Sequence, residues 1–181
     1  VRFLTGTDEH GQKVENAANA KQIKPKEFVN EVSKNFLKLT NALNLSNTDF
    51  IRTTQDRHIK SCKHLWNKLY NNKHIYLDNY SGWYSVRDEA YFQESELING
   101  KAPTGANVDW VEEPSYFFNL SQWQDKLLEF YNNNPEFILP LTRRNEVLNF
   151  VKGGLKDLSI SRTSFSWGVK VPNDAKHIMY V

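Results

Sequence analysis

The sequence predicts an α/β protein in which a small β-rich module interrupts a layer of strands and helices. The spacing of apolar residues gives the order strand, helices, strand, helix, β-rich segment, helices, strand, strand. The segment from about residue 74 to 118 is set apart by its aromatic and turn residues. With 181 residues, of which 39% are hydrophobic, the chain has room for one domain or for one domain and a part.

Two strands and two helices are expected in the first 53 residues. The apolar run Val1–Thr5 is too short for a helix and is closed by Gly6, which favours a buried strand. Gly11 releases the chain into a helix, and Pro25 stands in the first turn of a second one. Apolar residues recur along that second helix every three or four positions and predict a core-facing stripe: Phe28, Val32, Phe36, Leu39 and Leu43. After a polar turn, residues 50–53 form a brief strand.

A third helix leads into the β-rich module. Four residues share one face of this helix: Ile59, Cys62, Trp66 and Leu69. From Ile75 to Phe92 aromatic residues alternate with turn residues, which is typical of a β-ribbon. Residues 99–107 read as a loop, and Val108–Phe118 as another strand.

Two helices and two short strands are expected in the last third. Ser121 and Gln124 have the spacing of a capping box, and Pro135 ends the helix that follows. The pair Gly153-Gly154 closes the next helix. Residues 158–161 and 177–181 are short strand candidates.

Composition excludes several classes of function. A formal net charge of +2 gives no global basic field, so any contact with nucleic acid must be local. No stretch approaches the roughly 18 to 20 apolar residues of a membrane helix. The lone Cys62 excludes an intrachain disulfide and a multi-cysteine zinc site, and the five histidines show no recognised metal spacing. A reducing compartment is therefore expected.

The densest group of chemically active residues is the loop Gly6–Gly11. It lies between a strand and a helix, where open α/β sheets bind their ligands, and it offers Asp8, Glu9 and His10. An ordinary polar turn with a capping carboxylate is the alternative interpretation. Arg162 follows a short strand and could pair with Asp8, but the residues alone favour a solvated arginine on a surface loop.

Two other groups have simpler explanations. The basic residues of the third helix are typical of a solvated face, with phosphate contact as the less favoured alternative. The aromatic residues of the β-rich module could stack on bases but fit a β core. The sequence contains no GxxxxGK[ST], GxGxxG or GxSxG motif.

These residues carry a resemblance to a known family, the bacterial methionyl-tRNA synthetases, which are class I aminoacyl-tRNA ligases. The chain matches the family's pattern over its whole length in blocks of the right order. The blocks are Phe3–Gly11 (FLTGTDEHG), Phe50–Thr54, Gly82–Tyr84, Glu113–Phe118, Asn145–Leu148, Leu158–Arg162, Trp167-Gly168 and Tyr180-Val181. The resemblance implies a Rossmann-like parallel-sheet catalytic domain, present in part and interrupted by a small β-rich connective insert.

The resemblance also implies an activity. Family members join L-methionine to ATP with Mg²⁺ to form methionyl-adenylate, and then transfer the methionyl group to tRNA(Met) in the cytoplasm. The family's aspartate that binds the methionine amino group corresponds to Asp8, and the arginine that holds this aspartate corresponds to Arg162. Gly6, Thr7, His10 and Gly11 belong to the same active-site loop. No DNA or membrane partner is implied.

The sequence departs from the family pattern in two places. Many members carry a zinc knuckle with C-x-x-C in the insert, but Ser85 and Asp88 stand in these positions and Ala102-Pro103 lacks cysteine as well. No structural zinc is expected, as in alphaproteobacterial and mitochondrial forms, and the aromatic residues of the insert are expected to hold it together. The family's HIGH and KMSKS elements, which bind ATP, are also missing.

The expected organisation is an internal piece of a catalytic domain. Residues 1–73 correspond to the latter part of a first Rossmann half, 74–140 to the connective insert and 141–181 to the start of the second half. The isolated piece is expected to be inactive, and no catalytic residue is assigned. Another adenylyl-transferring class I ligase, or a non-catalytic RNA-binding or interaction module, remains as an alternative.

Overall fold

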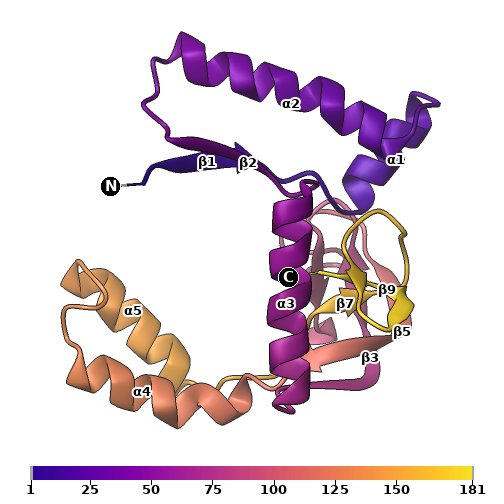
Figure 1. The fold of residues 1–181 in the computed structure, drawn as a ribbon. Helices are drawn as coiled ribbons and strands as arrows, with labels where there is room; N and C mark the ends of the chain where they lie inside the picture. The colour runs from indigo at the N-terminus through magenta and orange to yellow at the C-terminus, as the bar shows by residue number, and fades with distance from the viewer. Residues whose placement is uncertain (1, 181) are drawn as a thin grey trace.

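The computed structural model describes residues 2–180 and confirms the α/β class (Figure 1). Val1 and Val181, which the expected first and last strands include, lie outside the described residues. The α-helices are α1 (Gln12–Ala20), α2 (Pro25–Ala42), α3 (Asp56–Asn71), α4 (Gln124–Asn133) and α5 (Leu141–Lys152). The strands are β1 (Leu4–Thr7), β2 (Asp49–Arg52), β3 (Ile75–Ser85), β4 (Ala90–Phe92), β5 (Asp109–Phe118), β6 (Leu158–Ser159), β7 (Ser161–Arg162), β8 (Lys170–Val171) and β9 (Asp174–Met179).

The parallel part of the sheet consists of β1 and β2, with α1 and α2 running from one to the other (Figure 1). Thr7 lies opposite Arg52, so both strands end at the same edge. The sequence predicted that Gly6 ends the first strand, but Gly6 lies inside β1. A Cβ atom on Gly6 would collide with the carbonyl oxygen of Ile51, so the close approach of the two strands requires glycine here.

The predicted core stripe of α2 is only partly buried. Phe36 and Leu39 are each 49% exposed and Leu43 is 59% exposed, whereas Val29 is buried. Helical periodicity identifies the residues that share a face, but a sheet of two strands offers too little surface to cover all of that face. This prediction was therefore wrong for the second half of α2.

The predicted β-ribbon is confirmed as a four-stranded antiparallel sheet in the order β4-β3-β5-β6. β3 and β5 pair continuously from Ile75 opposite Phe118 to Tyr84 opposite Asp109. Cross-strand aromatic pairs line this ribbon. Trp83 and Trp110 pack edge to face at 5.4 Å, as do Tyr80 and Tyr91 at 4.3 Å.

The carboxylate of Asp88 connects two loops at one end of this ribbon. Asp88 accepts hydrogen bonds from Ser85 Oγ at 3.0 Å and from Thr104 Oγ1 at 2.5 Å, while Arg87 donates to the Thr104 carbonyl at 2.7 Å. These bonds lower the pKa of Asp88, with the Thr104 hydroxyl as the largest cause. The aromatic residues are therefore not alone in holding the insert, because polar bonds join its two distal loops.

We expect Asp88→Ala to lower the melting temperature of the insert by a few degrees, because two hydroxyl donors lose their acceptor. Thermal melting measures this shift, and faster hydrogen exchange of the amides of residues 85–106 shows that the loss of stability is local to these loops. Asp109→Ala, at an exposed position on β5, is the matched control and should leave the exchange unchanged. A chelator should also leave it unchanged, because carboxylate and hydroxyl groups are not the sulfur and nitrogen ligands of structural zinc. Equal exchange in both variants would contradict this account of the loop.

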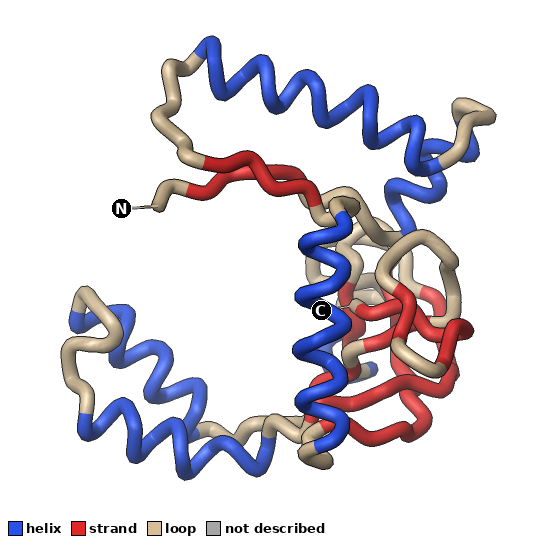
Figure 2. The backbone as a smooth tube through the Cα atoms, in the orientation of Figure 1, coloured by secondary structure: helices blue, strands red, loops and turns tan. Residues whose placement is uncertain are grey.

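Helix α3 lies beside the antiparallel sheets (Figure 2), and the main apolar core is formed between them. Its centre is built from Trp66, Ile75, Ile160 and Val171. The third sheet, in the order β7-β9-β8, is antiparallel as well, so the parallel pairing within residues 2–180 is that of β1 and β2.

α4 and α5 form a helical hairpin to one side of the sheets (Figure 1). The predicted capping box is not formed. Ser121 begins a short 3₁₀ turn, and the Gln124 side chain instead accepts a hydrogen bond from the Leu155 amide at 2.8 Å. The expected boundary between residues 140 and 141 falls in the connection between the two helices. None of the helices within residues 2–180 is long and apolar enough to cross a membrane.

Candidate active site

The loop after β1 is fixed by Glu9, which lies at the carboxyl ends of both parallel strands. Its carboxylate is bound by Arg52 Nε at 2.6 Å and Nη2 at 3.0 Å, and it accepts hydrogen bonds from Thr54 at 2.5 Å and Thr7 at 2.7 Å. The Glu9 amide donates to Thr53 Oγ1 at 2.9 Å. Burial raises the pKa of Glu9, but the bonds from Arg52, Thr54 and Thr7 outweigh it and the pKa is lowered. Glu9 is therefore ionised, and both of its carboxylate oxygens are bound by neighbouring side chains.

The sequence did not distinguish Glu9 from its neighbour Asp8, and the structure separates them. Asp8 is exposed and faces a cavity of about 570 Å³. Within residues 2–180 its carboxylate makes no hydrogen bond or ion pair. Asp8 is thus the carboxylate of this loop that is available to a ligand.

The cavity has a polar rim and an apolar interior. The polar residues of the lining are Asp8, His10, Thr53, His58 and Glu89, together with Gly11. The interior is lined by residues from α3, the antiparallel sheets and the last segment: Cys62, Leu65, Trp66, Leu69, Ile75, Phe118, Leu158, Ile160, Phe165, Val169 and Met179. Such a cavity suits a small molecule with an apolar body and a positively charged group.

His10 and Gly11 join the loop to the far end of the chain. The His10 ring packs edge to face with Trp167 at 5.5 Å, and burial lowers its pKa although Asp8 acts in the opposite direction. Gly11 has φ of 99°, which favours glycine, and its amide donates to the Trp167 carbonyl at 3.2 Å. The Trp167 indole in turn donates to the Glu9 carbonyl at 2.6 Å. Trp167 is therefore a structural part of the site to which the sequence assigned no role.

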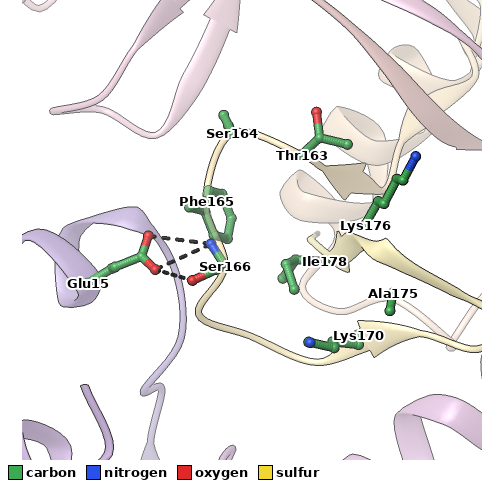
Figure 3. A pocket seen from close by; sticks show the side chains of 9 residues that line it. All are labelled: Glu15, Thr163, Ser164, Phe165, Ser166, Lys170, Ala175, Lys176 and Ile178. Carbon is green, nitrogen blue, oxygen red and sulfur yellow. Dashed lines mark hydrogen bonds between the residues drawn. The ribbon is translucent and has the colours of Figure 1, made fainter. Parts of the chain in front are cut away.

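A second contact between the ends of the chain lies beside the first. Glu15 accepts hydrogen bonds from the Ser166 amide and hydroxyl, as Figure 3 shows. This contact borders a shallower hollow of about 400 Å³, into which Lys170 and Lys176 also project from β8 and β9 (Figure 3). The two contacts hold residues 163–170 against the beginning of α1.

Arg162 is buried, and its surroundings differ from those expected. The guanidinium carbon lies 4.8 Å from the Tyr91 ring and 4.6 Å from the Tyr180 ring, and Nη1 donates to Ser159 Oγ and the Ser161 carbonyl, both at 2.7 Å. No ion pair joins Arg162 to Asp8 within the described part of the chain; its acidic neighbour is Glu113 at 4.0 Å. The expected direct pairing of these residues is therefore not present in this structure.

Tyr180 links Arg162 to the cavity. Its ring covers the guanidinium and also lines the cavity that Asp8 faces. Its hydroxyl donates to the Glu89 carbonyl at 2.9 Å, and the Glu89 carboxylate lies 3.4 Å from Lys13 at the beginning of α1. Burial raises the pKa of Tyr180, and Glu89 raises it further. A turn of the insert thus reaches the rim of the site.

No group of three or more His, Cys, Asp and Glu side chains is placed to hold a metal ion among residues 2–180. Cys62 Sγ and His58 Nδ1 form a close pair, 3.6 Å apart, on the cavity wall. Burial raises the pKa of the Cys62 thiol, which keeps it protonated.

Comparison with known proteins agrees with the fold. The family profile described as "tRNA synthetases class I (M)" matches residues 1–108 and 92–181. The chain belongs to the class I (M) family of tRNA synthetases, that is, to the methionyl-tRNA synthetases.

Individual relatives support this assignment. The chain is 63% identical over 182 residues to a protein of Rickettsia bellii named methionine--tRNA ligase, and 54% identical over 186 residues to one of Rhizobium meliloti with the same name. Each alignment covers 100% of this chain but 36% of the relative. A structure of Mycobacterium tuberculosis methionyl-tRNA synthetase in complex with methionyl-adenylate superposes with a TM-score of 0.92 at 55% identity, covering 99% of this chain and 36% of that one. The chain therefore spans about a third of the length of these relatives.

Proposed function

We propose that the full-length protein is a methionine–tRNA ligase and that this chain forms part of its catalytic region. The protein would activate L-methionine with ATP to methionyl-adenylate and transfer the methionyl group to tRNA(Met). The observation that carries the proposal is the likeness over the entire chain to enzymes of this name, at up to 63% identity. The Asp8 carboxylate at a cavity with many apolar lining residues gives this likeness a chemical basis.

The proposed role of Asp8 is to bind the ammonium group of methionine. An ionised carboxylate without a protein partner, next to an apolar interior, gives a strong charge-assisted hydrogen bond to an ammonium group and room for an apolar side chain. Glu9 and Gly6 position Asp8 by fixing the loop, and His10, Thr7 and Gly11 complete the loop around it. Arg162 would assist from behind Tyr180, whose ring covers the guanidinium and lines the cavity.

Several further assignments belong to the same proposal. ATP would bind with Mg²⁺ through residues outside this chain, and no structural zinc would be held by the insert. The three parts would be residues 1–73, 74–140 and 141–181, with α5 linking the insert to the last part. The protein would act in the cytoplasm.

Amino-acid-dependent exchange of pyrophosphate into ATP tests the proposal. The full-length protein should catalyse this exchange with methionine and with none of the other standard amino acids at comparable concentration. Exchange with a different amino acid would identify another class I ligase instead. Absence of exchange with every amino acid, together with salt-dependent tRNA binding, would favour a non-catalytic RNA-binding module.

A further inference from the structure

A buried carboxylate of the insert lies next to Arg162. Glu113 on β5 is 6% exposed and Arg162 is 5% exposed, with 4.0 Å between Glu113 Oε1 and Arg162 Nε. A guanidinium group that is removed from water needs an opposite charge and hydrogen-bond acceptors nearby. Asp8 is not within ion-pair distance of Arg162 in the described part of the chain, so Glu113 is the acid in position to balance this charge.

The Glu113 carboxylate is itself held in place. Oε2 accepts hydrogen bonds from the Thr163 amide at 2.9 Å and the Thr163 hydroxyl at 2.7 Å, and Oε1 accepts one from the Tyr91 hydroxyl at 3.1 Å. An ionised carboxylate has about four acceptor positions, so Oε1 can accept another hydrogen bond. Arg162 Nε faces it as a buried donor for which the described residues provide no hydrogen-bond partner.

Two of the three guanidinium nitrogens of Arg162 face neighbouring residues, and the third, Nη2, makes no hydrogen bond to a described residue. Nη1 is used by Ser159 and Ser161, and Nε lies against Glu113. Tyr91 and Tyr180 cover the guanidinium plane. No hydrogen bond within residues 2–180 involves Nη2.

We propose that Glu113 is a positioning residue for methionine binding, which acts by orienting the Arg162 guanidinium from the insert side. The inference rests on the proposed function. Glu113 touches no part of the cavity. With Nε facing Glu113 and Nη1 held by β6 and β7, the guanidinium plane is fixed against the ring of Tyr180, which lines the cavity that Asp8 faces. The β-rich insert thereby contributes to amino-acid affinity, although its strands lie outside the parallel sheet.

The test compares Glu113→Gln with Glu112→Gln in the full-length protein. Glu112 is the preceding residue of β5 and is exposed, so it controls for loss of a charge on this strand. Glu113→Gln should raise KM for methionine about tenfold, because the buried guanidinium of Arg162 loses the charge that lies 4.0 Å from its Nε. KM for ATP should stay within about twofold of wild type, and Glu112→Gln should match wild type in both constants.

KM for ATP distinguishes positioning from general damage. The competitive inhibition constant of 4-(methylthio)butanoate, which is methionine lacking its ammonium group, should rise together with KM for methionine in Glu113→Gln, because Tyr180 lines the cavity that both ligands would enter. A parallel rise of this constant and of both KM values would show a merely structural role and overturn the inference. A methionine KM equal to that of Glu112→Gln would also overturn it.

Tyr91→Phe keeps the test valid if Glu113→Gln does not fold. It removes one hydrogen bond from Glu113 Oε1 and leaves the charge and the aromatic ring in place. KM for methionine should rise about two- to threefold with KM for ATP unchanged; an unchanged methionine KM would contradict the inference. If wild type shows no methionine-dependent exchange, the proposed function fails together with this inference, whereas failure in the variants alone leaves the function intact.

Discussion

Replacing Asp8 by alanine in the full-length protein should lower methionine-dependent pyrophosphate exchange by about 100-fold or more. The variant loses the carboxylate that we propose binds the substrate ammonium group, and truncation of one partner of a desolvated charge pair costs about 2–5 kcal/mol. Stability should change by less than about 0.5 kcal/mol, because Asp8 is exposed and bonds to no other described residue. Steady-state exchange and thermal melting measure the two effects separately.

Asp125→Ala is the matched control for Asp8→Ala. Asp125 is an exposed aspartate on α4, does not line the cavity and makes no ion pair within residues 2–180. Its exchange rate should equal that of wild type. Wild-type kinetics in Asp8→Ala would remove Asp8 from the site, and a large drop in its melting temperature would show that the residue is structural instead.

Replacing Glu9 by glutamine should destabilise the full-length protein by about 3 kcal/mol, near the lower end of the cost of breaking a buried ion pair. The side chain is 2% exposed and receives hydrogen bonds from Arg52, Thr54 and Thr7. The amide of glutamine removes the charge that balances Arg52 and turns one acceptor oxygen into a donor. Thermal or urea unfolding measures the loss, and Glu31→Gln on the exposed face of α2 is the control.

The effect of Glu9 should depend on pH in a defined direction. Its pKa is lowered in the folded protein, so the ionised form stabilises the fold. This contribution is fully present above the unfolded value of about 4.3 and is lost as the pH falls through the lower, folded value. The difference in melting temperature between wild type and Glu9→Gln should therefore be constant near neutrality and shrink in acid. A difference that grows in acid would contradict the assigned ionisation.

The element order could be predicted because it depends on local patterns. The apolar spacing in α3 fits the repeat of a helix, and the alternation of aromatic and turn residues in β3 and β5 fits that of a β-strand. The capping box at Ser121 was wrong because a three-residue spacing does not reveal that Gln124 has a distant partner in Leu155. The α2 stripe was wrong because a pattern within one helix contains no information about the area that covers it.

The site could be predicted only as far as the loop that contains it. Gly6, Asp8 and Gly11 stood out because glycines and charges cluster between a strand and a helix. Glu9 is buried and Asp8 stays exposed because Arg52 and Thr54 bond to Glu9, and these two residues come close to Glu9 only when β1 and β2 pair. Glu113 follows the alternation of β5, because it is buried between exposed Glu112 and Pro114, but a charged side chain by itself indicates the solvent face, and its burial could not be predicted from the residue type.

The bonds between Trp167 and the loop after β1 also determine the order in which the site can form. Trp167 and Glu9 are separated by 158 positions. Because a nascent chain leaves the ribosome from its amino end, β1, β2 and α3 can assemble well before Trp167 has been synthesised. Contacts of such long sequence separation form slowly, since closing the intervening loop costs entropy before any bond is gained. The loop after β1 therefore acquires its final shape late in folding, after the elements that support it.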